Sequence, residues 1–233
     1  MGRLTILLRT FARRFRLIRA MRMIIPARAS EADFENAVLS MIEEGSVAWD
    51  VGANIGQYTR RFAKLVGDRG VVVAFEPSPA NIAVLPDAGE FNAKLHKVQA
   101  ALGNFTGKVN MQMGAGDNSP TNRIVETEPT DIGISVQMYR AQDAIRKLKL
   151  PRPHVVKIDV EGCEFDCLLG MDSLLDDPQL RALFIEVHFG LLAERGQQFA
   201  PLQIEQLLKT KGFLVSWVDP SHIQAVRPRA RVA

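Results

Sequence analysis

Apolar runs of strand length alternate with segments of helical spacing along most of the chain. The run at residues 47–52 is followed by helical spacing of Tyr58, Phe62 and Leu65, and then by a second apolar run at residues 71–77. Because strands buried on both faces are apolar throughout, this pattern predicts an α/β fold with a mostly parallel sheet and helices on both of its faces. Further strands are predicted at residues 96–102, 108–113, 133–138, 155–160, 182–189 and 213–218, and further helices at residues 30–45, 81–85, 141–150, 163–175 and 201–212.

The organisation of the chain is that of one domain with a basic segment at each end. Its 233 residues suffice for a single large core, and 47% hydrophobic with 24% charged residues is the usage of a folded globular protein. We expect the domain at residues 30–220, an amphipathic arm at residues 1–29 and a basic tail at residues 221–233. Residues 113–132 lack periodicity and are predicted to form a long loop of the kind that serves as a lid or binding segment.

The arm concentrates positive charge. The first 30 residues hold eight arginines and no acid, which leaves 21 basic against 26 acidic residues downstream. The acidic body gives no reason to expect a nucleic-acid partner. We favour a surface helix that packs on the domain, with a peripheral membrane contact or an organelle targeting peptide as alternatives. No run in the arm could span a bilayer and no cleavage site follows it, so we expect a cytoplasmic protein.

The two cysteines, Cys163 and Cys167, are too few for a disulfide framework. Their spacing places them on one face of a helix. Free cysteines are mostly buried, so we interpret both as core thiols in a reducing compartment.

The segment with the clearest chemistry runs from Asp50 to Gly56, between a predicted strand and a predicted helix. Glycines at positions 52 and 56 permit a tight turn and a close backbone approach to a ligand. Glu76 ends the next predicted strand, 20 residues after Gly56, at a spacing where a carboxylate can accept hydrogen bonds from both hydroxyls of a ribose. The pair indicates a cofactor that contains adenosine.

Dinucleotides and S-adenosyl-L-methionine compete for such a site. A dinucleotide site favours the pattern G-x-G-x-x-G, and this turn lacks it. Asp50 and Asn54 suit the ammonium and carboxylate groups of a methionine moiety better than a phosphate. The residues therefore favour S-adenosyl-L-methionine, with an NAD-type oxidoreductase as the alternative enzyme class.

Four ordered segments, VAWDVGANIGQYT, VVAFEPSP, VVKIDVEGCEFDCLLG and FIEVH, resemble successive motifs of the FkbM family of S-adenosylmethionine-dependent methyltransferases. The resemblance covers about residues 38–217. It implies the Rossmann-like, seven-stranded class I methyltransferase fold and O-methylation of a hydroxyl on a sugar, glycolipid or small natural product. The acceptor would then be a small molecule or a glycan, and a non-catalytic module that binds S-adenosyl-L-methionine is a further alternative.

The resemblance also implies roles for individual residues. Glu76 would bind the ribose, Asp159 would lie near the sulfonium, and Ala101 would lie where relatives contact adenine. The full set of expected cofactor-binding residues is Asp50, Gly52, Ala53, Asn54, Gly56, Tyr58, Thr59, Glu76, Pro77, Ala101 and Asp159.

Proton removal from an acceptor hydroxyl requires a base at a strand end. Glu186 and His188 alternate on one predicted strand, and a neutral imidazole near physiological pH is a suitable acceptor, so His188 is the predicted general base. Lys157, Asp159 and Glu161 alternate in the same way and would share one face, with Glu161 and Glu186 as the other catalytic candidates.

Asp159, Glu161, Glu186 and His188 could also supply ligands to a magnesium or manganese ion. Nothing in their spacing demands one, and we expect a site without metal. His96, His154 and His222 are interpreted as structural or exposed.

Overall fold

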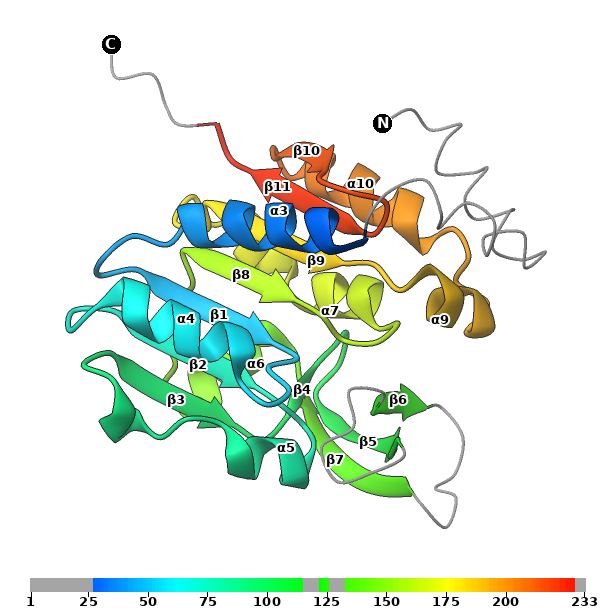
Figure 1. The fold of residues 1–233 in the computed structure, drawn as a ribbon. Helices are drawn as coiled ribbons and strands as arrows, with labels where there is room; N and C mark the ends of the chain where they lie inside the picture. The colour runs from blue at the N-terminus through cyan, green and yellow to red at the C-terminus, as the bar shows by residue number, and fades with distance from the viewer. Residues whose placement is uncertain (1–26, 115–121, 126–132, 229–233) are drawn as a thin grey trace.

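The computed structural model describes residues 27–114, 122–125 and 133–228, and a seven-stranded sheet forms its centre (Figure 1). The strand order is β10-β11-β9-β8-β1-β2-β3. Strands β1, β2, β3, β8 and β9 run parallel to one another, and β11 runs antiparallel to both of its neighbours. The predicted mostly parallel sheet is confirmed. The strands are β1 (Val47–Val51), β2 (Val71–Phe75), β3 (Lys94–Val98), β8 (Val155–Ile158), β9 (Ala182–Glu186), β10 (Leu214–Trp217) and β11 (His222–Val226).

Helices cover both faces of this sheet because successive strand residues point to opposite sides. Ala48 packs with Phe34 and Phe62 on one face, whereas its neighbour Trp49 packs with Leu168 on the other. The first face carries α3 (Ala27–Ser40) and α4 (Gln57–Val66), which cross in front of the sheet in Figure 1. The second face carries α6 (Ala141–Leu148), α7 (Glu164–Gly170), α8 (Asp172–Leu175) and α10 (Ala200–Thr210).

Two short helices follow the strand ends directly. They are α5 (Pro79–Val84) after β2 and α9 (Phe189–Glu194) after β9. The Ser78 hydroxyl accepts a hydrogen bond from the backbone N–H of Asn81 and so caps α5.

A second sheet, with the order β4-β7-β5-β6, lies toward the carboxyl ends of β1 and β8 (Figure 1). The strand patterns at residues 108–113 and 133–138 were predictable, but their separation from the main sheet was not. Residues 123–125, which we expected within a loop, form β6, so that part of the prediction is wrong. The strands are β4 (Ala101–Leu102), β5 (Gly107–Gln112), β6 (Arg123–Val125) and β7 (Gly133–Tyr139).

The ends of the domain also differ from expectation. Helix α3 begins at Ala27, within the segment assigned to the arm. Strand β11 pairs with β9 and β10, so the sheet continues past the expected boundary at residue 220 through Val226. Residues 1–26 and 229–233 lie outside the described part of the chain, so the interpretations of the arm stay predictions. No helix in the described ranges has the length and apolar character needed to cross a bilayer.

Substitution of Phe184 tests the packing of the first face. Phe184 is fully buried on β9 and meets the Phe34 ring edge to face, with centroids 6.0 Å apart. We expect Phe184→Ala to lower the free energy of unfolding by about 3–5 kcal/mol, because it leaves a cavity. Chemical denaturation measures the change. Phe199→Ala is the control: its side chain is 56% exposed, and an equal loss there would contradict this packing.

Candidate active site

A pocket of about 740 Å³, its open mouth included, lies at the carboxyl ends of β1, β2 and β8. This is the edge at which parallel α/β sheets bind ligands. Met111 of β5 and Ile124 of β6 contribute to its wall, so the second sheet covers part of it. Six expected cofactor-binding residues line it: Gly52, Asn54, Glu76, Pro77, Ala101 and Asp159.

The turn after β1 depends on glycine at position 52. Gly52 has φ +78°, and a Cβ there would lie 1.7 Å from the carbonyl oxygen of Asp159. The predicted tight turn is therefore present, and its close approach is to the backbone that follows β8. Gly56 (φ +84°) precedes α4, where a Cβ would lie 2.7 Å from Pro86.

Glu76 joins this turn to the start of α5. One carboxylate oxygen accepts a hydrogen bond from the Asn54 N–H (2.8 Å), and the other accepts one from the Ser78 N–H (2.9 Å). Burial raises the pKa of Glu76, and these two amide donors oppose the rise. The turn and the carboxylate thus lie side by side at the pocket, as the sequence predicted.

Two asparagines offer acceptors to a ligand. The side-chain oxygens of Asn54 and Asn81 are buried and have no hydrogen-bond partner among the described residues. Both residues line the pocket. A buried acceptor without a donor is costly, so this wall fits a ligand rich in amino and hydroxyl groups. The amine, ribose hydroxyls and adenine amino group of S-adenosyl-L-methionine are such donors.

Several expected cofactor-binding residues lie behind the pocket and do not line it. Asp50 is fully buried, where it accepts a hydrogen bond from the Thr59 hydroxyl (2.6 Å) and pairs with Lys157 (3.5 Å). The ring of Tyr58 lies against the Lys157 ammonium, 5.0 Å from it. Ala53 packs in a small apolar cluster. Asp50, Tyr58 and Thr59 thus support the turn from behind the pocket, and their expected contact with the cofactor stays a prediction.

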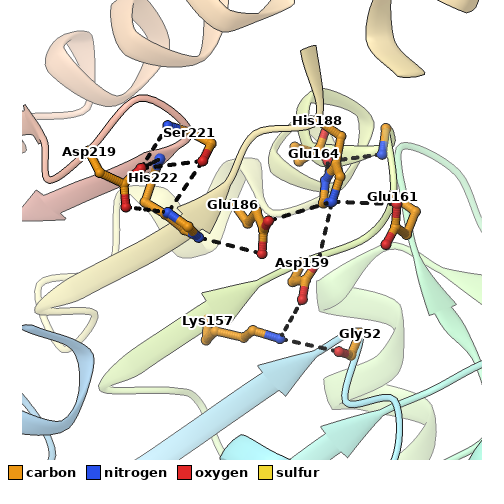
Figure 2. Close-up of polar contacts among 11 residues, drawn as sticks. Gly52, Lys157, Asp159, Glu161, Glu164, Glu186, His188, Asp219, Ser221 and His222 are labelled. Carbon is orange, nitrogen blue, oxygen red and sulfur yellow. Dashed lines mark hydrogen bonds and ion pairs between the residues drawn. The ribbon is translucent and has the colours of Figure 1, made fainter. Parts of the chain in front are cut away.

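A second polar group surrounds His188, the residue that precedes α9 (Figure 2). Its Nδ1 lies 2.7 Å from the fully buried carboxylate of Glu164. Its Nε2 faces three further carboxylates: Glu161 at 3.4 Å, Asp159 at 3.8 Å and Glu186 at 3.9 Å. All three expected catalytic residues thus meet beside Asp159.

The charge of His188 differs from expectation. Burial alone would lower the pKa of His188, but the hydrogen bond to Glu164 and the charges of Glu164, Glu161 and Asp159 raise it to about 9. These contacts favour the protonated imidazole near neutral pH in the ligand-free protein, whereas the sequence argument took the ring as neutral. The role of His188 as general base stays a prediction.

The expected alternation of Lys157, Asp159 and Glu161 also ends early. Strand β8 stops at Ile158, and Glu161 lies in a turn with φ +48°. Lys157 and Asp159 still form an ion pair, at 3.2 Å. Glu161 reaches the cluster through the turn and not through the pleat of the strand.

Three groups of this cluster have the chemistry of metal ligands. Asp159, Glu161 and His188 each place one ligand atom within 4.8 Å of the others. The expectation of a metal-free site stays a prediction.

The model of the methyltransferase FkbM domain matches residues 50–215. The chain belongs to the methyltransferase FkbM family. Hexuronic acid methyltransferase AglP of Haloferax volcanii is 26% identical, with 69% of this chain and 64% of that protein covered. Methyltransferase 1 of Beauveria bassiana is also 26% identical, with 73% of this chain and 75% of that protein covered. The match thus spans a little under two thirds of the archaeal relative.

Solved structures agree with the fold of this FkbM domain. A methyltransferase FkbM from Methylobacillus flagellatus superposes with a TM-score of 0.54 at 16% identity, over 77% of this chain and 43% of that one. A Streptococcus mutans protein solved in complex with SAH gives a TM-score of 0.52 at 13% identity, over 88% and 99%. The fold is the Rossmann-like class I fold of S-adenosylmethionine-dependent methyltransferases, as predicted.

Some site residues of this FkbM domain were not predicted from the sequence. Asn81 lies in α5, three residues after the cap Ser78 and five residues after Glu76, so the helix start that follows the strand-end acid could have indicated it. Met111 and Ile124 gave no signal because the position of the second sheet was unknown. Glu164 is one acid among several near α7, and its buried contact with His188 depends on tertiary packing.

The cysteines behave as expected. Cys163 is 6% exposed, Cys167 is fully buried, and neither forms a disulfide. Burial raises the pKa of Cys163 to about 12, although the Arg195 guanidinium donates to its sulfur. It is a thiol at neutral pH.

Substitution of Glu76 tests the cofactor side of the pocket. Glu76→Gln replaces one acceptor oxygen by a donor, so we expect S-adenosyl-L-methionine to bind at least about tenfold more weakly, or about 1.4 kcal/mol. Isothermal titration calorimetry measures the affinity. Glu44→Gln, at an exposed carboxylate, should bind normally. Unchanged affinity in Glu76→Gln would contradict the assignment of this wall.

Proposed function

We propose that this protein transfers the methyl group of S-adenosyl-L-methionine to a hydroxyl of a sugar-type acceptor. The observation that carries the proposal is that two sites lie next to each other at one edge of the sheet. One is the pocket around Glu76, whose buried hydrogen-bond acceptors lack donors. The other is the His188 cluster, and Asp159 belongs to both. The acceptor class draws support from the hexuronic acid methyltransferase among its relatives.

The cofactor would lie between the ends of β1, β2 and β8. Glu76 has lone pairs left for the ribose hydroxyls, while Asn54 and Asn81 offer their free oxygens to amino or hydroxyl groups. Ala101 and Leu102 supply an apolar wall. Asp159 would face the positive end of the ligand, since Lys157 lowers the pKa of its carboxyl against the effect of burial and keeps it ionised. When bound, the sulfonium supplies an electrophilic methyl group.

The acceptor hydroxyl would lie against the His188 cluster. The methyl carbon forms a bond to the acceptor oxygen as its bond to sulfur breaks, and the electron pair stays on sulfur. The hydroxyl proton passes to Nε2 of neutral His188. Glu164 prepares this ring, because an Nδ1–H that donates to Glu164 leaves the Nε2 lone pair toward the acceptor. Glu161 and Glu186 would bind and orient the hydroxyl.

Cofactor choice and catalysis can be tested in one series. We expect calorimetry to show binding of S-adenosyl-L-methionine and none of NAD. We expect radiolabelled methyl transfer to at least one member of a panel of neutral hexosides, hexuronic acid glycosides and polyols. Cofactor binding without transfer to any of these acceptors would favour a non-catalytic binding module. Binding of NAD alone would contradict the proposal.

The pH profile tests the base. Because His188 accepts the proton only in its neutral form and its pKa is raised to about 9, kcat/KM should rise with pH and level off above about pH 9. His188→Gln should lower kcat by about 10²–10⁴ and remove this ionisation. His96→Gln, on β3 at the far edge of the sheet, serves as the control. A profile of His188→Gln that matches the wild type would exclude His188 as the base.

A further inference from the structure

Glu186 lies between two histidines. One carboxylate oxygen faces Nε2 of His188 at 3.9 Å, and the other faces Nε2 of His222 at 3.5 Å (Figure 2). His222 begins β11 and lies opposite Glu186 in the antiparallel register of β9 and β11. The side chain of Glu186 is 36% exposed.

His222 itself is held firmly. Its Nδ1 lies 2.6 Å from Asp219, and its ring stacks on Phe34 of α3 with centroids 4.0 Å apart. It is 8% exposed. Burial alone would lower the pKa of His222, but Asp219 and Glu186 raise it to about 9. These carboxylates favour the protonated imidazole at neutral pH, which carries an N–H on both nitrogens.

We propose that His222 is a positioning residue for methyl transfer: its Nε2–H holds one oxygen of Glu186 and so directs the other toward the His188 cluster, where the acceptor binds. The proposal rests on the proposed function. The contact made by Nε2 of His222 is not needed to hold β11 in the sheet, because β11 already pairs with β9 and β10 through its backbone. What Nε2 contacts is a half-exposed carboxylate of the site.

The proposal extends the site beyond the residues matched by the family model. Phe34 precedes residue 50 and His222 follows residue 215, so both lie outside the match. The acceptor side would thus be completed by chain segments on either side of the family domain, through the contact of α3 with β11.

Two variants of His222 separate positioning from a structural role. His222→Phe keeps a ring on Phe34 but removes both donors, whereas His222→Gln restores an N–H near the place of Nε2. We expect His222→Phe to lower kcat about tenfold or more on whichever acceptor the panel identifies, with the affinity for S-adenosyl-L-methionine unchanged. His222→Gln should recover most of this loss.

His154→Gln is the matched control. His154 lies at the opposite end of the sheet, where its Nδ1 accepts from the Val47 N–H (2.8 Å), so its loss should affect stability and not kcat. An unchanged kcat in His222→Phe would overturn the proposal. The proposal would also be overturned if His222→Phe lowered kcat, thermal stability and cofactor affinity together and His222→Gln did not restore them.

A second measurement needs no acceptor and so separates this proposal from the proposed function. The charged or polar groups that face His222 are Glu186 from β9, Asp219 and Ser221 from the turn before β11, and the charge of Asp159 after β8; the Phe34 ring covers its face. We expect an NMR titration to give His222 a pKa of about 9, and Glu186→Gln to lower it while His154 stays unchanged. No shift of His222 would show that the contact is absent and would overturn the proposal, whether or not the wild type transfers methyl groups.

Discussion

The buried ammonium group of Lys157 holds together the carboxyl ends of β1 and β8. It lies 3.5 Å from Asp50, 3.2 Å from Asp159 and 3.3 Å from the carbonyl oxygen of Gly52. Burial disfavours its charge, but the two carboxylates raise the pKa of Lys157, so it stays protonated. A buried charge without its partners is strongly destabilising, which ties this lysine to both strands. The turn is thereby fixed where the Asn54 N–H meets Glu76.

This constraint divides the sheet edge into two halves with different chemistry. The half around Glu76 has buried acceptors that lack donors and an apolar wall, as a nucleoside requires. The half around His188 gathers carboxylates about one imidazole and is partly open to solvent. Asp159 belongs to both, since it pairs with Lys157 and faces His188. A methyl donor and a hydroxyl acceptor would therefore meet beside a fixed carboxylate.

The sequence predicted those features that depend on local pattern. Alternating apolar runs gave the parallel sheet, and Gly52 and Glu76 located the pocket, because strand ends of a parallel sheet converge on one edge. Features that depend on tertiary packing were out of reach. Asp50 points into the core because Lys157 lies there, and the raised pKa of His188 requires carboxylates from separate segments. His222 lies in the segment predicted to be a tail, because the polar residues before β11 do not indicate that a further strand pairs with β9.

A crystal structure of the protein with S-adenosylhomocysteine tests the central claim, that Glu76 and the turn after β1 bind one end of the cofactor while Asp159 faces the other. The account predicts ribose hydroxyls on the Glu76 carboxylate and the sulfur directed toward Asp159, with His188 open to the acceptor side. A ligand that binds elsewhere, or that leaves the asparagine oxygens of positions 54 and 81 without donors, would contradict it.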